Sequence, residues 1–256
     1  MRPWSALRSD LERRGLNAIG VADGRPYEAW LPGCRAVVVV GSGGPRLWTR
    51  FVDAVQADPS TLVAERDPLD AFVRRELAAA GGEGPGRRWV LADQQQEPAA
   101  PMQQLALQAG LGWRSRLWLV LHPVYGPWLG LRAACFTTEP LPVDGPLGAP
   151  SPCAGCAAPC APACPGGALD AGDMDWRACT LHRAGSRDCV GACHARSACP
   201  EGAGWAYPAE EQAYHQEQAV GRRALVARLG LVDGVDVAGI DWVARARAAR
   251  ASLARG

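Results

Sequence analysis

The chain has 256 residues, enough for one large domain or for a main domain with a smaller one appended. Its 27 basic and 26 acidic residues leave a formal charge of +1, so it lacks the general basic character of a nucleic-acid-binding protein. The charged N-terminal segment does not resemble a signal peptide, and no apolar run approaches the roughly 20 residues that cross a membrane. We therefore expect a cytoplasmic protein with no membrane partner. Ten cysteines in that reducing compartment indicate metal binding or redox chemistry.

Helical and strand patterns alternate along the first 140 residues. Apolar residues at helical spacing predict helices over residues 4–14, 46–57, 68–80 and 102–109. Short apolar runs predict strands over residues 36–44, 89–92, 117–121 and 129–136. The last two strands flank the turn HPVYGPW, which suggests a hairpin or two neighbouring strands. The alternation predicts an α/β or α+β layer domain.

A glycine-rich turn, GSGG, follows the strand that begins at Ala36. It lacks both the GxGxxG spacing of a dinucleotide-binding loop and the lysine of a phosphate-binding loop. We therefore interpret it as an ordinary turn at the end of a strand.

The composition changes abruptly at Pro140, where a segment rich in proline and glycine leads into the cysteines. From Pro208 onward helical periodicity returns with scattered arginines, which we expect on a solvated face. We therefore divide the chain into an α/β domain over residues 1–140, a cysteine-rich module over residues 141–206, and a helical segment over residues 207–256 that packs on the first domain.

Eight of the ten cysteines fall between Cys153 and Cys199, in the runs CAGCAAPCAPACP and CVGACHARSACP and between them. A cubane iron–sulfur cluster needs four thiolates that converge from different directions, and closely spaced cysteines on a loop supply three of them. In two-cluster ferredoxins the cysteine before proline ligates the other cluster, because proline turns the chain away from the first. By that logic one cluster would be held by Cys153, Cys156, Cys160 and Cys199, and a second by Cys164, Cys179, Cys189 and Cys193.

The spacing departs from the CxxCxxCxxxCP run of bacterial ferredoxins, since one interval is lengthened and the second run reads CxxxCxxxxxCP. Each extra residue adds up to about 3.5 Å of reach, so a cage remains possible with altered loops. Zinc is an alternative, because His182 and His194 lie among the thiols. A thiol or disulfide-bearing module without clusters is another. Cys34 and Cys135 stand apart on apolar segments and are interpreted as buried, inert thiols.

Several stretches carry a resemblance to known families. LALQAGLGWRSRLWLVLHPVYGPWLGLRAAC, from Leu105 to Cys135, followed by the cysteine runs, resembles the cobalamin-dependent epoxyqueuosine reductases. DPLDAFVRREL from Asp67, HPVYGPWLGLR, and YPAEEQAYHQ from Tyr207 are similar to proteins that decyanate or dealkylate vitamin B12. Both families imply a flavin-reductase-like (nitroreductase-like) sheet domain that binds a corrinoid, here joined to a ferredoxin-like module.

The resemblance also implies a binding site. A corrinoid would lie over the sheet domain, with a set of aromatic and basic residues near its rim: Trp113, His122, Tyr125, Trp128 and Arg132. The reductases place an aspartate proton donor in the loop that here reads QQQEPAAP, so that acid is displaced or absent in this chain. Glu97 is the candidate catalytic acid in its place, and a solvated loop glutamate is the alternative interpretation. A flavin is the alternative cofactor, since distant relatives of this fold bind one.

Three functions remain open at the level of sequence. The first, which we favour, is a cobalamin-binding reductase or B12-processing enzyme in which one or two 4Fe-4S clusters pass electrons to a corrinoid substrate or cofactor. The second is a ferredoxin-like electron-transfer protein that serves a redox partner protein without a corrinoid. The third is a structural zinc or thiol module. The charge balance gives no reason to expect a nucleic-acid partner, although the resemblance leaves tRNA open.

Overall fold

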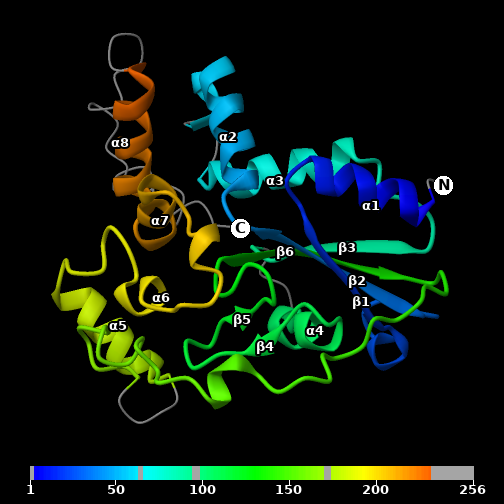
Figure 1. Cartoon of the computed structure of the whole chain (residues 1–256). Coiled ribbons are helices and arrows are strands. Elements are labelled where there is room, and N and C mark those ends of the chain that lie inside the picture. The colour runs from blue at the N-terminus through cyan, green and yellow to red at the C-terminus, as the bar shows by residue number, and fades with distance from the viewer. Residues whose placement is uncertain (1–2, 63–65, 94–98, 170–173, 232–256) are drawn as a thin grey trace, which may run out of the picture.

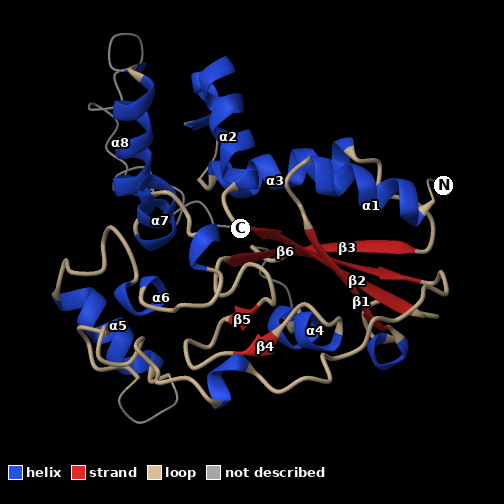
Figure 2. Cartoon of the chain, viewed as in Figure 1, coloured by secondary structure: helices blue, strands red, loops and turns tan. Residues whose placement is uncertain are grey.

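The computed structural model describes residues 3–62, 66–93, 99–169 and 174–231. The chain forms a mixed α+β structure in which helices surround a small antiparallel sheet (Figures 1 and 2). Within these residues no helix is both long enough and apolar enough to cross a membrane. In chain order the elements are α1 Trp4–Arg13, β1 Ala18–Asp23, β2 Ala36–Gly43, α2 Arg46–Ala57, α3 Pro68–Ala79, β3 Arg87–Leu91, α4 Met102–Gln108, β4 Trp113–Arg114, β5 Val120–Leu121, β6 Leu129–Thr137, α5 Trp176–Gly185, α6 His194–Ser197, α7 Ala209–Gln216 and α8 Gln218–Leu229.

The main sheet has the strand order β1-β2-β6-β3, and each neighbouring pair is antiparallel. Strand β2 is buried along its whole length, because both faces of the sheet are covered. Its successive valines point to opposite faces: Val38 and Val40 join one core cluster, and Val37 and Val39 join the other. An unbroken apolar run is what a strand with two covered faces requires.

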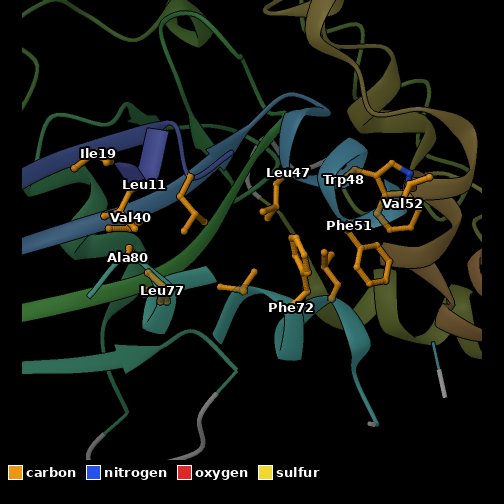
Figure 3. Packing of buried hydrophobic residues seen from close by; sticks show 14 of the residues in the cluster. Leu11, Ile19, Val40, Leu47, Trp48, Phe51, Val52, Phe72, Leu77 and Ala80 are labelled. Carbon is orange, nitrogen blue, oxygen red and sulfur yellow. The ribbon is translucent and has the colours of Figure 1, made fainter. Parts of the chain in front are cut away.

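The first core cluster lies between the sheet and α1, α2 and α3. Figure 3 shows Leu11 of α1 beside Val40 of β2, and Phe51 of α2 close to Phe72 of α3 farther along the same cluster. Helix α4 covers the opposite face through Leu105 and Ala106. The helix faces therefore follow from the apolar spacing that predicted them.

Helices α7 and α8 are attached to the first core cluster by Tyr214, Leu225 and Val226. The ring of Tyr214 packs against Trp48, with ring centroids 5.3 Å apart. Arg222, which we expected on a solvated face, is only 4% exposed and donates hydrogen bonds to the carbonyls of Leu62 and Arg66. The two rings therefore hold α7 against α2, and the guanidinium of Arg222 holds α8 against the segment before α3.

The expected helices over residues 4–14, 46–57, 68–80 and 102–109 are confirmed to within about one residue. The expected hairpin is wrong, because β5 pairs with β4 while β6 pairs with β2 and β3. Strand β1 was missed. The antiparallel sheet makes the fold α+β, whereas the flavin-reductase-like assignment and the three-part division of the chain stay predictions.

The GSGG segment is an ordinary strand-end turn, as expected. The amide of Gly43 donates to Oδ1 of Asn17, and the amide of Gly44 donates to the carbonyl of Trp128. A Cβ atom at Gly43 would lie 2.0 Å from Cδ2 of Tyr125. Both amides therefore already donate hydrogen bonds within the fold. The two glycines leave room for the rings of Tyr125 and Trp205, so the turn is not arranged to bind a phosphate group.

Candidate functional site

The first predicted set of cysteines lines one small cavity. Four thiols, from Cys153, Cys156, Cys160 and Cys199, face a space of about 20 Å³ together with Leu117. Burial raises the pKa of the Cys199 thiol, and the charges of Cys153 and Cys160 add to the rise. The fold thus brings Cys199 into the same cavity as Cys160, which lies 39 residues earlier in the sequence.

The second predicted set lines a larger cavity of about 250 Å³, formed by Cys164, Cys179, Cys189 and Cys193. Burial raises the pKa of the Cys189 thiol. The nearby charges of Cys164, Cys179 and Cys193 raise this pKa further. His182 and His194 line the same cavity. Each cavity is therefore lined by four cysteines that the cysteine–proline pattern groups together, while their role as cluster ligands stays a prediction.

Local structure positions these thiols. Cys179 lies on α5, whose start is capped by the carboxylate of Asp175, and Cys193 occupies the N-cap of α6. Ala158 adopts a left-handed conformation with φ of 55°, and its amide donates to the sulfur of Cys156 over 3.4 Å. A strained non-glycine backbone that aims an N–H at a thiol is typical of functional loops.

All ten cysteines are free thiols. Among the described residues, no group of three or more His, Cys, Asp or Glu side chains is arranged to hold a single metal ion. Cys34 and Cys135 are buried in the sheet domain, as expected, and burial raises the pKa of both thiols.

A third pocket, of about 320 Å³, opens beside the sheet at Arg132. We call it the Arg132 pocket. It is lined by Asp67, Leu69, Asp70, Ala92, Asp93, Arg132, Tyr214, His215, Gln216 and Gln218. Three segments far apart in the sequence meet here, and each belongs to a stretch on which the resemblance to B12-processing proteins rests: DPLDAFVRREL, HPVYGPWLGLR and YPAEEQAYHQ.

Charges of both signs face the Arg132 pocket. Nε of Arg132 donates to the hydroxyl of Ser42 over 3.0 Å, and Nη1 lies 3.9 Å from a carboxylate oxygen of Asp70. Burial raises the pKa of Asp70 to about 6, with the nearby charge of Asp67 adding to the rise. Arg132 is thus held in place by a neutral hydroxyl, with an acid of unusually high pKa beside it.

The predicted turn HPVYGPW packs as an aromatic cluster. Nδ1 of His122 accepts hydrogen bonds from the amides of Val124 and Tyr125, and burial lowers the pKa of His122 to about 4. The ring of Tyr125 lies against His122, with centroids 4.6 Å apart, and edge-on to Trp205 at 5.2 Å. His122 is therefore a neutral imidazole whose Nδ1 is occupied by the turn itself.

The remaining predicted site residues lie in different settings. Trp128 is 2% exposed, and its ring packs against Tyr207 and under the guanidinium of Arg196. Trp113 lies on β4 and donates its indole N–H to the carbonyl of Ala149. Glu97 lies outside the described residues.

Sequence reasoning named neither Glu211 nor His215 as site residues, although both lie in the YPAEEQAYHQ stretch. Glu211 is 2% exposed, and Oε1 lies 3.8 Å from Nε2 of His215. A signal was present: Tyr207, Glu211 and Tyr214 recur at spacings of four and three, which places the glutamate on the buried face of α7.

The three spaces adjoin one another through shared residues. Leu117 lines both cysteine cavities, and Gln216 lines both the second cysteine cavity and the Arg132 pocket. Gln216 also accepts a hydrogen bond through its carbonyl from Arg183 of α5. The order is therefore first cysteine cavity, second cysteine cavity, Arg132 pocket.

No family model matches the chain, and no curated protein matches it in sequence. Solved structures do resemble it. Epoxyqueuosine reductase from Bacillus subtilis is 17% identical, with a TM-score of 0.53 over 80% of this chain and 68% of that chain. An epoxyqueuosine reductase with a tRNA-Tyr epoxyqueuosine-modified stem loop is 16% identical, with a TM-score of 0.51 over 80% and 66%.

The B12-trafficking protein CblC from C. elegans is 10% identical, with a TM-score of 0.57 over 88% of this chain and 96% of that chain. At these identities the likeness shows a shared fold and nothing finer. It agrees with the resemblance drawn from the sequence as far as the fold is concerned.

Proposed function

We propose that this chain is an iron–sulfur redox protein that binds a corrinoid, as a cobalamin-dependent reductase or a B12-processing enzyme. One observation carries the proposal: eight thiols divide into two sets of four, each set lines its own cavity, and the second cavity adjoins the Arg132 pocket. Two cluster sites in series leading to a ligand pocket are what a path for single electrons requires.

The donor sets fit iron–sulfur clusters. Each set holds four cysteines, the number that a 4Fe-4S cluster takes. The second cavity, of about 250 Å³, offers far more room than the first, of about 20 Å³, so support is strongest for a cluster in the second. When bound, such clusters supply electrons one at a time at low potential. The thiols would hold them, and the amide of Ala158 would donate to a ligating sulfur.

Two arguments support a corrinoid. The fold is similar to those of epoxyqueuosine reductase and a B12-trafficking protein. The segments that carry the sequence resemblance converge at the Arg132 pocket, whose volume of about 320 Å³ would take a small molecule or one edge of a larger one. Arg132 would orient polar groups of the ligand, and the turn from His122 to Tyr125 would support its rim. A flavin is the alternative ligand for this position.

The first experiment is a metal and sulfide assay on anaerobically purified protein, followed by addition of hydroxocobalamin. We expect about four to eight iron atoms per chain with matching sulfide. We also expect a shift in the visible spectrum of the added cobalamin. Arg132→Gln should weaken this binding, while Arg25→Gln, on an exposed ion pair with Asp23, should not. A colourless protein that contains no iron would contradict the proposal.

The second candidate is an electron-transfer protein without a corrinoid, and the third is a zinc module. His182 and His194 favour zinc in one respect, since both line the second cavity beside thiols. A brown protein that leaves the cobalamin spectrum unchanged would identify the former. One zinc ion per chain without sulfide would identify the latter. A tRNA partner, known for one protein of similar fold, would require a separate binding test.

A further inference from the structure

Three buried polar atoms on α7 lack hydrogen bonds within the described part of the chain, and one of them, Oε1 of Glu210, forms an ion pair with Arg228. The other two are Oε2 of Glu211 and Nε2 of His215. The two side chains are one helical turn apart, and the closest approach, from Oε1 to Nε2, is 3.8 Å. Buried polar atoms are nearly always paired, so an unpaired acid facing an unpaired imidazole calls for an explanation. Hydrogen bonds in catalytic sites are often long in the free protein and shorten when a ligand binds.

The surroundings keep this pair neutral. Burial raises the pKa of Glu211 to about 8, with Glu210 adding to the rise, while Arg132 and Arg196 oppose it. Burial lowers the pKa of His215 to about 3, and the same two arginines add to the fall. Two tyrosines are further titratable neighbours: the rings of Tyr207 and Tyr214 lie 5.5 and 6.0 Å from that of His215. At pH 7 Glu211 therefore carries a proton and His215 does not.

His215 connects the buried acid with the Arg132 pocket. Its Nε2 is buried near Glu211, yet a quarter of its side chain is exposed and lines the pocket. The ring thus has one nitrogen on the acid's side and other atoms on the pocket's side. A neutral imidazole can accept a proton at one ring nitrogen and release one from the other.

We infer that Glu211 is the proton reserve for reduction at the Arg132 pocket, with His215 passing the proton from the buried carboxyl to the bound substrate. The inference rests on the proposed function, because it needs a reduction that consumes a proton. Under this inference the proton donor is Glu211 and does not come from the QQQEPAAP loop, where the sequence suggests Glu97. After each turnover the ionised Glu211 regains a proton from solvent.

Cyanocobalamin is a suitable probe substrate, because its reduction requires one electron and releases a cyanide ion that takes up one proton. In this assay one electron from titanium(III) citrate would reduce the cobalt of the probe from Co(III) to Co(II) as the bond between cobalt and cyanide breaks. The bonding pair leaves with cyanide. The proton from Glu211 converts the cyanide to hydrogen cyanide, and titanium(IV) is the oxidised product.

The first test needs no substrate. Infrared spectra of the purified protein at pH 7 should contain a carboxylic-acid carbonyl band that is missing in Glu211→Gln and fades above about pH 8. Glu210→Gln is the matched control, since Glu210 precedes Glu211 but pairs with Arg228 at 2.6 Å. The control should keep the band. A wild-type spectrum without any Glu211-dependent band at pH 7 overturns the inference.

The route is tested by hydrogen exchange of that band. Transfer to D₂O should shift the band quickly in the wild type and at least tenfold more slowly in His215→Phe. Equal rates would mean that the proton reaches the pocket by another path.

The functional test follows the rate of cyanocobalamin reduction against pH. In wild type and Glu210→Gln the rate should fall about tenfold per pH unit above the pKa of Glu211. In Glu211→Gln the rate should be low and should not show this decrease with pH. If Glu211→Gln shows the same decrease in rate with rising pH as the wild type, the inference is overturned. If the protein does not bind cyanocobalamin, the proposed corrinoid function fails, and the infrared tests still decide the role of Glu211.

Discussion

The hydroxyl of Tyr214 on α7 donates a hydrogen bond of 2.9 Å to the carboxylate of Asp67, the residue that caps α3. The same carboxylate oxygen accepts from the amide of Asp70, and the amide of Leu69 donates to the Tyr214 hydroxyl. One buried phenol therefore ties the start of α3 to a helix 147 residues later in the chain. Both helices contribute residues to the Arg132 pocket, and Asp67 and Tyr214 are themselves among its lining residues.

Tyr214→Phe should lower the free energy of unfolding by about 1.5–3 kcal/mol, because a buried hydrogen bond to a charged group is lost. Tyr27→Phe is the matched control: its hydroxyl donates to the neutral amide oxygen of Gln108 over 2.8 Å, and its loss should cost about 0.5–1.5 kcal/mol. Chemical denaturation measures both. An equal cost for the two variants would contradict the role of the Asp67 carboxylate.

Asp70 should make the protein less stable as pH rises. Its pKa is raised from 3.8 to about 6, so between these values the folded state holds a proton that the unfolded state has released. Stability from this group is therefore present below pH 4 and lost as pH rises through 6. Asp70→Asn should raise the free energy of unfolding by about 2 kcal/mol at pH 7 and leave it unchanged at pH 4. Asp53→Asn, at an exposed position of α2, is the matched control, and chemical denaturation at both pH values compares the two variants.

Much of the secondary structure could be predicted because it is determined locally. Helix α2 was predicted with both of its ends, since Leu47, Phe51 and Val55 recur every four residues on one buried face. Likewise, the valine run identified β2. The prolines after Cys164 and Cys199 led us to group the cysteines as the two cavities group them, because proline redirects the chain; that the groups bind clusters stays a prediction.

Other features depend on contacts that no local pattern specifies. Strand β1, AIGVAD, contains a glycine and no alternation, and it exists because it pairs with β2 along six residues. The pairing of β5 with the two-residue strand β4 was likewise not predicted, because a strand of two residues leaves no periodic pattern in the sequence. At the candidate site, the spacing of Tyr207, Glu211 and Tyr214 favours a buried position for Glu211, but it does not indicate what surrounds the carboxyl. Only the fold brings Glu211 near Arg132 of β6 and Arg196 of α6.

The second cysteine set should be separable from the first by mutation. Cys189→Ser removes one of four thiols from the larger cavity and should lower iron content by about four atoms per chain in protein that holds two clusters. Cys153→Ser should do the same for the first cavity, leaving the paramagnetic signal of the other cluster. Cys34→Ala, a buried thiol on the sheet domain, is the control and should keep all the iron. Loss of all iron in each single variant would mean that the two sites do not form independently.

The contact between Gly43 and Tyr125 should be sensitive to a single methyl group. A Cβ at residue 43 would lie 2.0 Å from the Tyr125 ring, and the hydroxyl of that ring accepts a hydrogen bond from Asn17, which also bonds the Gly43 backbone. The ring has no room to retreat, since Trp205 packs edge-on against it at 5.2 Å. Gly43→Ala should therefore cost about 1–3 kcal/mol by overpacking and should change the near-ultraviolet circular dichroism of the aromatic cluster. Gly148→Ala, where an added Cβ meets nothing within 4 Å, should be close to neutral in both measurements. If Gly43→Ala were neutral as well, the HPVYGPW turn would not be packed against the end of β2, and its proposed support of the ligand's rim would lose its structural basis.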